Sequence, residues 1–328
     1  MPDLVGITTS VPIEVVYAAG LAPVDLNNHF IASGRTEEML RVAEAAGFPR
    51  SSCAWSKGVY AAAKDLELDR VIGVAEGDCS NTHAMLELLS ADGVDVTRFG
   101  YPYGRDAHEL RRRIERLADG FGVTYAAAEA ERPRLESIRD RLREVDRLTV
   151  DGRVTGGENL EWTISGSDMR SNPERFGADI DAFLAEARER PATSGPRVAL
   201  CGIPPAYADL AAVLESLGVC VVLNEFPRQF ALLDGGADLV ETYLNFTYPY
   251  DVFFRLQALQ REIAARRVDG LVHYVQSFCF RAIQDRLLRD AVSAPVLTLE
   301  GDRPGKLDGS ALTRVETFVD ILQRGGRS

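Results

Sequence analysis

The sequence has few cysteines, and no two of them lie at short spacing. There are five among 328 residues, and no CxxC pair occurs. Zinc ribbons and thioredoxin-like redox sites are built on such pairs, so both are excluded. An odd number of cysteines also argues against a disulfide framework. Any metal site must therefore be assembled from distant segments. The cysteines are Cys53, Cys79, Cys201, Cys220 and Cys279.

Basic charge and long apolar runs are scarce as well. Lys and Arg number 37 against 49 Asp and Glu, which gives a net charge of −12. Nucleic acids and anionic membranes bind basic faces, so neither is expected as a partner. No stretch approaches the roughly 18 apolar residues that span a bilayer. The N-terminus lacks the basic and apolar regions of a signal peptide, and we expect a cytoplasmic protein.

A nucleotide-binding loop is also lacking. The segment 301–308, "GDRPGKLD", has only three residues between its two glycines. Leu307 stands where a phosphate-binding loop needs Ser or Thr for Mg²⁺. No GxGxxG follows a strand-like run either. We therefore expect that this chain does not itself hydrolyse ATP.

Short apolar segments alternate with amphipathic helix-like segments in both halves of the chain. This alternation predicts mainly parallel sheets with helices on both faces, and its repetition predicts an α/β fold with two doubly wound lobes. The expected strands are 3–9, 70–77, 196–203, 219–226, 268–276 and 294–302. The expected helices are 11–20, 81–89, 106–122, 126–148, 178–188, 206–218, 249–267, 278–292 and 308–324.

Turn residues separate the two halves. Gly, Ser, Pro and Thr are frequent between positions 151 and 195, and a boundary is expected in such a segment. We predict an N-terminal lobe over 1–150, a helical and loop connection over 151–195, and a C-terminal lobe over 196–328. A site is expected in the cleft between the two lobes.

Three cysteines occupy similar local positions. Cys79 and Cys279 lie in turns from a predicted strand to a predicted helix, and Cys53 begins another helix-like run. Ligands collect beyond the carboxyl ends of parallel strands, and a helix N-terminus stabilises a thiolate. Each cysteine could also be a small buried side chain. Cys220 lies in an apolar strand and is expected in the core, whereas both interpretations stay open for Cys201.

Several longer segments resemble one enzyme family. The stretch 5–28, "VGITTSVPIEVVYAAGLAPVDLNN", is similar to the N-terminal segment of the 2-hydroxyacyl-CoA dehydratase / benzoyl-CoA reductase superfamily, which includes double-cubane-cluster proteins. Four later segments resemble the second half of the same family: "NEFPRQFALL", "TYPYDVFFR", "HYVQSFCFR" and "LEGDRPGKLDGSALTRVETF". The similarity covers most of the chain and keeps the family's order.

The resemblance implies an iron–sulfur site in each subunit. Its ligands would be Cys53 in "SSCAW", Cys79 in "GDCSN" and Cys279 in "QSFCF". Three thiolates leave one iron of a [4Fe–4S] cluster open, either to a substrate or to a sulfide that bridges to a second cubane. The resemblance also implies a homodimer or a heterodimer with a homologous subunit. It further implies a separate ATP-hydrolysing iron–sulfur activator.

Three functions follow as alternatives. The first is radical reductive chemistry on an acyl-CoA, as in the dehydratases, a lyase or oxidoreductase activity. The second is a homodimeric double-cubane reductase of small molecules, and the third is a metal-free α/β ligand-binding protein. Glu14 is our predicted catalytic proton donor, because it lies at a helix start after the first strand. The other candidate donors are Glu76, His83, Glu225 and His273.

Overall fold

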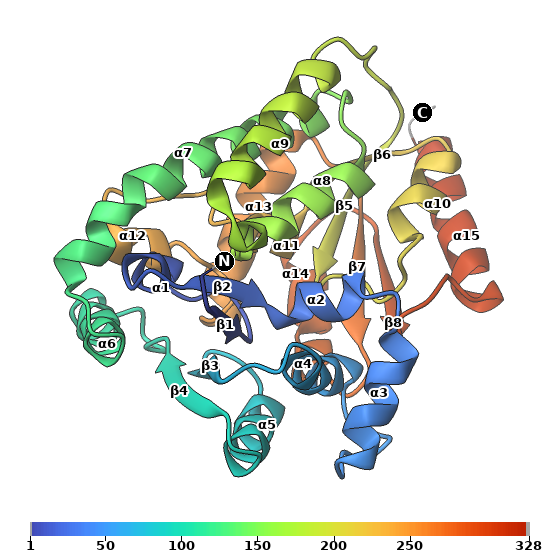
Figure 1. Cartoon of the computed structure of the whole chain (residues 1–328). Coiled ribbons are helices and arrows are strands. Elements are labelled where there is room, and N and C mark those ends of the chain that lie inside the picture. Colours follow the sequence, from blue (N-terminus) through green and yellow to red (C-terminus); the bar gives the residue numbers. More distant parts are fainter. Residues whose placement is uncertain (1, 326–328) are drawn as a thin grey trace. The chain divides into compact units, whose positions relative to one another are not determined.

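The computed structural model describes residues 2–325, which form two compact units. The first unit takes the chain up to Asp140 and adds Ser165–Ala178 and Gln229–Asp251. The second takes Arg141–Ile164, Asp179–Arg228 and the chain from Val252 onward. Each unit contains one four-stranded sheet (Figure 1).

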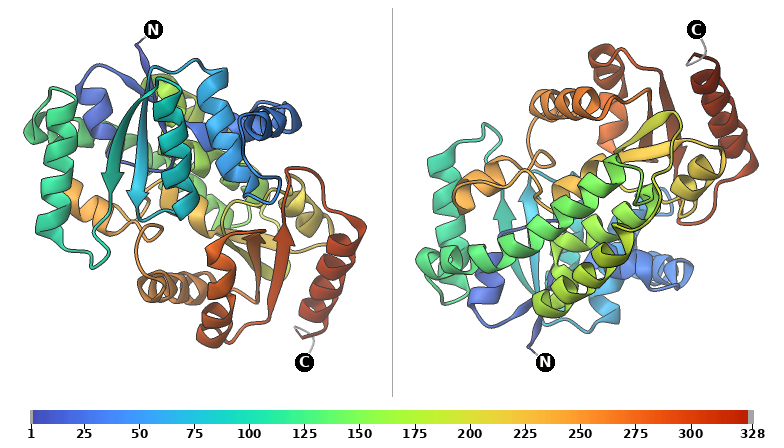
Figure 2. Two further views of the ribbon diagram at one scale, coloured as in Figure 1. Left: turned by 90° about the horizontal axis from the view of Figure 1, so that it is seen from below. Right: turned by 90° about the horizontal axis from the view of Figure 1, so that it is seen from above.

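The sheet of the first unit is entirely parallel, with the strand order β2-β1-β3-β4. Figure 2 (left) shows β3 and β4 as neighbouring arrows. All four strands are short. Most residues of β3 are buried, and they include the apolar residues Val71 and Ile72. The strands are β1 (Leu4–Ile7), β2 (Ala22–Asp25), β3 (Arg70–Glu76) and β4 (Asp95–Gly100).

Helices cover the sheet of the first unit. One core is formed by apolar side chains of α2, α3, α4 and α5 packed on β3. The approach is close, because a Cβ at Gly73 of β3 would lie 2.2 Å from Leu86 of α5. The elements of this unit are α1 (Ile13–Ala18), α2 (Leu26–Ala32), α3 (Thr36–Ala45), α4 (Ala54–Asp65), α5 (Ser80–Ala91), α6 (Ala107–Gly120), α12 (Leu239–Leu244) and the short 3₁₀ turns η1 (Ser165–Ser167) and η2 (Met169–Ser171).

The second unit repeats this strand arrangement. Its sheet is also entirely parallel and has the order β6-β5-β7-β8, so in both units the second strand lies beside the first at one edge. The chain then crosses to the other side of the first strand for the third and fourth. The strands are β5 (Arg197–Gly202), β6 (Cys220–Asn224), β7 (Gly270–Gln276) and β8 (Val296–Gly301).

Helices lie on both faces of the second sheet. Val198 and Leu200 of β5 pack on α10 and α15, whereas Ala199 and Cys201 pack on α13 and α14. Alternate side chains of one strand are thus buried on opposite faces, as in a doubly wound sheet. The helices of this unit are α8 (Gly156–Ile164), α10 (Leu210–Ser216), α13 (Val252–Arg266), η3 (Phe280–Gln284), α14 (Asp285–Ala291) and α15 (Gly309–Gly325).

Three helices pass from one unit to the other along the chain. They are α7 (Tyr125–Val150), α9 (Pro173–Ala187) and α11 (Glu225–Phe230). Neither compact unit is one continuous segment of the chain, because residues 165–178 and 229–251 return to the first unit. Whether 1–150, 151–195 and 196–328 fold as separate domains stays a prediction.

The predicted α/β fold with two parallel sheets is confirmed. The structure adds β2 and β4, which the sequence pattern did not indicate. The expected helix 278–292 is instead the 3₁₀ turn η3 followed by α14. Among residues 2–325, every helix is too short or too polar to cross a bilayer.

Candidate functional site

The turns after the third strand of each sheet each place a cysteine at the same position. β3 and β7 are each 7 residues long, and in both a cysteine follows three positions after the strand ends. Cys79 and Cys279 are extended, with φ/ψ of −80/162° and −88/131°. Each carbonyl accepts a hydrogen bond from the amide three residues on, Thr82 or Ala282, and both N···O distances are 3.1 Å. The two cysteines therefore hold equivalent places.

These turns lie at the topological switch points of the sheets. In each sheet the chain runs from the first strand to one side and then to the other side for the third strand. The loops at the carboxyl ends of the first and third strands consequently diverge, and ligands collect at such points in open parallel sheets. Cys79 and Cys279 are thus placed where α/β proteins bind small molecules.

A hydrogen-bond network surrounds Cys79. The Asp78 carboxylate accepts hydrogen bonds from the Cys79 amide at 2.8 Å and from the Thr82 hydroxyl at 3.0 Å. It also accepts one from the Tyr248 hydroxyl at 3.1 Å. The Cys79 sulfur lies 3.8 Å from the Thr82 hydroxyl oxygen. Asp78, Thr82 and Tyr248 were not predicted from the sequence. Tyr248 is distant from Cys79 along the chain, and only the hydrogen bonds show that Asp78 and Thr82 connect to it and to Cys79.

The turn before Cys79 requires glycine. Gly77 has φ +102°, and a Cβ there would lie 2.6 Å from Cβ of Pro249. The backbone conformation and the close approach of Pro249 both exclude larger residues. The segment that carries Tyr248 and Pro249 therefore packs directly on the Cys79 turn.

The Cys279 turn contains an unusual backbone conformation. Phe278 has φ +64°, a left-handed value that costs energy for a residue with a side chain. Its ring is 61% exposed, and the nearby Phe280 and Ile283 are also exposed. Non-glycine residues in this region cluster at functional sites, where the surrounding structure holds them.

A buried ion pair lies close to Cys279. Arg255 donates to both carboxylate oxygens of Glu225 at 2.7 and 2.8 Å, and Glu225 also accepts from the Gly202 amide. Burial opposes ionisation, but Arg255 lowers the pKa of Glu225. Burial opposes the charge of Arg255, but Glu225, and after it Cys201 and Cys279, raise the pKa of Arg255. Glu225 is therefore an ionised partner of Arg255, and a proton-donor role for it stays a prediction.

Cys53 precedes α4 in the first unit. It is the N-cap residue of that helix, has φ −53°, and is 8% exposed. Its carbonyl accepts from the Lys57 amide at 3.2 Å. The neighbouring Trp55 is half-buried and packs edge-on against Phe30, with ring centroids 6.0 Å apart. Trp55 thus belongs to a hydrophobic core of the first unit.

The three predicted ligands suit an iron–sulfur cluster by their chemistry. Cys53, Cys79 and Cys279 each precede the first turn of a helix, and all five cysteines are free of disulfides. Thiolates are the ligands of such clusters. Among the described residues, no group of three or more His, Cys, Asp or Glu side chains that could hold a metal ion was found. The ligand assignment stays a prediction.

Glu14 lies in a buried network of the first unit. It is fully buried, and it accepts hydrogen bonds from Arg139 at 2.8 Å and from the Tyr243 hydroxyl at 2.9 Å. Burial and then Glu14 raise the pKa of Tyr243 well above its ordinary value. These contacts describe a carboxylate that joins α1, α7 and α12. Its predicted catalytic role stays a prediction.

The remaining candidate proton donors lie in different environments. His83 is exposed on α5, and the exposed Glu76 pairs with Arg113 at 2.7 Å. His273 is fully buried, its Nδ1 lies 2.7 Å from Asp285, and its Nε2 has no hydrogen-bond partner in the described part of the chain. Burial lowers the pKa of His273, which favours the neutral ring.

Two arginines and two further cysteines lie in the second unit. Arg228 is 3.4 Å from Asp146, and Arg281 is 6% exposed and lies over the Phe226 ring at 5.3 Å. Cys220 lies in β6, as expected for a core residue. Cys201 is the residue before the last of β5 and is buried; burial raises its pKa, so this thiol favours the protonated form.

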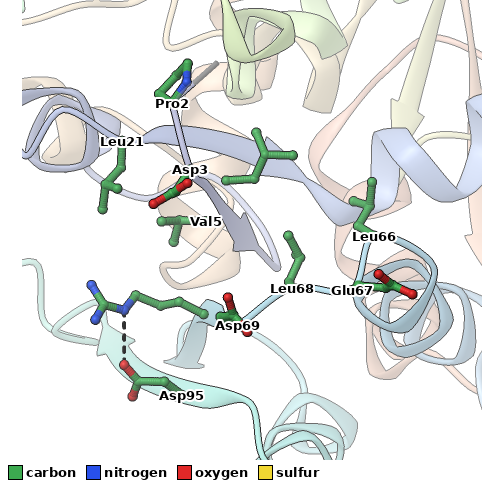
Figure 3. A pocket seen from close by; sticks show the side chains of 11 residues that line it. Pro2, Asp3, Val5, Leu21, Leu66, Glu67, Leu68, Asp69 and Asp95 are labelled. Atoms are coloured by element: carbon green, nitrogen blue, oxygen red, sulfur yellow. Dashed lines mark hydrogen bonds and ion pairs between the residues drawn. The ribbon is translucent and has the colours of Figure 1, made fainter.

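One cavity of the first unit lies at the opposite end of its sheet from Cys79. Figure 3 shows the side chains that line this cavity, which include the first residues of β1, β3 and β4. Its volume is about 530 Å³. Arg70 pairs with Asp95 within it at 3.0 Å. This is the amino end of the sheet, whereas Cys79 follows the carboxyl end of β3. The cavity includes none of the predicted site residues.

A comparison with known protein families supports the family resemblance of the sequence. The family model described as 2-hydroxyglutaryl-CoA dehydratase, D-component, matches residues 8–322. No curated protein matches the chain. The family match confirms the superfamily that the sequence motifs predicted. Because it spans nearly the whole described chain, the protein belongs to the 2-hydroxyglutaryl-CoA dehydratase D-component family.

Proposed function

We propose that this chain is an iron–sulfur subunit that carries out radical reductive dehydration of an acyl-CoA. The observation that carries the proposal is the equivalence of Cys79 and Cys279, each three residues beyond the third strand of a parallel sheet. Membership of a dehydratase family supports it. Cys53 is the third proposed ligand. Three thiolates leave one iron of a [4Fe–4S] cluster free for a substrate.

When bound, the cluster supplies single low-potential electrons and an open iron. The chain supplies the thiolates and their surroundings. Cys53 and Cys79 are the N-cap residues of α4 and α5, so each proposed ligand directly precedes a helix. Phe278 and Phe280 flank Cys279 in the sequence, and we propose that their exposed rings limit access of water to a bound cluster.

Partners are part of the same proposal. The chain lacks a phosphate-binding loop, so we propose that a separate ATP-hydrolysing iron–sulfur activator delivers the electrons. A homodimer, or a heterodimer with a homologous subunit, is proposed from the resemblance. We also propose a cytoplasmic location, where thiols stay reduced.

The decisive experiment is the iron and acid-labile sulfide content after anaerobic purification and reconstitution. We expect about four irons per chain, a sharp loss in Cys79→Ala, and no loss in Cys220→Ala, a matched change of a cysteine in β6. An acyl-CoA-dependent change of the visible spectrum would support dehydratase chemistry.

Other outcomes separate the alternatives. Sulfide in excess of iron, in a homodimer that does not respond to acyl-CoA, would favour a double-cubane reductase. A colourless protein after reconstitution would contradict the proposal and favour a metal-free ligand-binding protein.

A further inference from the structure

Three segments of the first unit meet at the side chain of Asp78. The carboxylate accepts from the Cys79 amide, from the Thr82 hydroxyl in the first turn of α5, and from the Tyr248 hydroxyl. The fit of Pro249 against Gly77 fixes the same turn from the other side. The position of Asp78 is therefore set by several independent contacts.

Thr82 connects this carboxylate to the sulfur of Cys79. Its side chain is 5% exposed, and its oxygen lies 3.0 Å from Asp78 Oδ2 and 3.8 Å from Cys79 Sγ. A hydroxyl has one proton to donate. While that proton goes to Asp78, the Thr82 oxygen can only accept from Cys79, and this suits a protonated thiol.

A cysteine that binds a metal has no proton to donate. Its sulfur is then an acceptor, and Thr82 is placed to donate to it. Asp78 would lose one of its hydrogen bonds in this change, while the Cys79 amide and the Tyr248 hydroxyl still donate to it. Rotation of the Thr82 hydroxyl is therefore compatible with the rest of the network.

We propose that Thr82 is a positioning residue for Cys79, with a hydroxyl that donates to Asp78 in the metal-free protein and to the Cys79 sulfur in the metal-bound protein. This inference rests on the proposed function, because it requires that Cys79 is a ligand. A hydrogen bond to a ligand sulfur stabilises the more negative, reduced state of a cluster and so raises its reduction potential.

The test compares two substitutions of Thr82 in the reconstituted full-length chain. Thr82→Ser keeps the hydroxyl, and Thr82→Val keeps the shape without it. We expect wild-type iron content in both variants, a wild-type midpoint potential in Thr82→Ser, and a more negative potential in Thr82→Val. An unchanged potential in Thr82→Val would overturn the inference.

A second variant leaves Thr82 intact. Tyr248→Phe removes one donor from Asp78 and keeps the ring, so Asp78 should hold the Thr82 hydroxyl more strongly. We expect its potential to move in the same direction as in Thr82→Val. If Thr82→Val does not fold, a wild-type potential in Tyr248→Phe would overturn the inference. Cys79→Ala is tested in parallel: retention of wild-type iron there would instead refute the ligand assignment.

Discussion

The burial of Glu14 bears on whether its role is structural or catalytic. Its side chain and that of Arg139 are both fully buried, and they pair at 2.8 Å. Removing one partner of a buried pair leaves an uncompensated charge, which costs about 3–5 kcal/mol. We therefore expect Glu14→Gln to lower the free energy of unfolding by an amount of this order, measured by urea denaturation of the metal-free protein.

Glu136 provides the matched control for this prediction. It also lies close to Arg139, at 3.3 Å, but its side chain is 21% exposed. Partly solvated ion pairs contribute little, so Glu136→Gln should cost less than about 1 kcal/mol. If Glu14→Gln instead kept wild-type stability and abolished turnover, the predicted catalytic role would gain support over the structural one.

At the scale of elements, the two cysteine turns are equivalent without being similar in sequence. The segments "AEGDCSN" and "VQSFCFR" share only the cysteine at the matching position. One turn uses Gly77 for its positive φ, whereas the other uses Phe278. The sequence predicted similar strand-to-helix turns for both cysteines, and the structure adds that each turn follows the third strand of its sheet.

The strain at Phe278 leads to a second prediction. A left-handed residue with a side chain costs roughly 1–2 kcal/mol, and glycine avoids this cost. The Phe278 side chain is largely exposed, so its removal loses little packing. We expect Phe278→Gly to be more stable than Phe278→Ala by about 1 kcal/mol in urea denaturation.

Phe280 is the control for the effect of glycine itself. It is also partly exposed, but it begins η3 and does not have a positive φ. There Gly should be no better than Ala, because glycine gains nothing where φ is negative and loses more conformational entropy on folding. The same advantage of Gly over Ala at both positions would show that the left-handed conformation is not the cause.

Regular elements were predicted well where the apolar pattern is continuous. The expected segments 70–77 and 268–276 correspond closely to β3 and β7. β2, "APVD", was missed because it has four residues and includes a proline, which is disfavoured within strands. β4 was missed because its first four residues show no buried alternation. Among the site residues, the cysteines could be selected from the sequence because of their residue type. Asp78 and Thr82 could be selected only from their hydrogen-bond distances to each other and to Cys79.

At the scale of the whole molecule, each compact unit is built from segments that are not consecutive in the sequence. Residues 229–251 return to the first unit after the chain has formed β5 and β6. This return brings Tyr243 to Glu14 and Tyr248 to Asp78. Periodicity reports local structure only, so the sequence could not indicate such long-range partners.

A pair of buried carboxylates also affects the stability of the molecule. Asp25 at the end of β2 is 4% exposed, and Asp168 in the turn before η2 is 5% exposed. Asp168 accepts from the Asp25 amide at 2.8 Å, and Ser167 donates to the Asp25 carboxylate at 2.7 Å. Burial, and then the charge of Asp25, raise the pKa of Asp168 from 3.8 to about 7.

The direction of the pH effect follows from this shift. A raised pKa means that the folded protein keeps a proton that the unfolded chain releases. The stability linked to Asp168 is therefore fully present below about pH 3.8 and is lost as the pH rises to about 7. A shift of this size corresponds to at most about 4 kcal/mol.

Asp168→Asn should remove this pH dependence, because the amide does not ionise. We expect the variant to be more stable than the wild type at pH 8, with the difference shrinking toward pH 4, in urea denaturation of the metal-free protein. Asp285 supplies a control of opposite sign: burial would raise its pKa, but hydrogen bonds led by His273 lower it to about 2, so Asp285→Asn should cost most near neutral pH. Equal pH profiles for the wild type and Asp168→Asn would mean that the pKa of Asp168 is not raised in the folded protein.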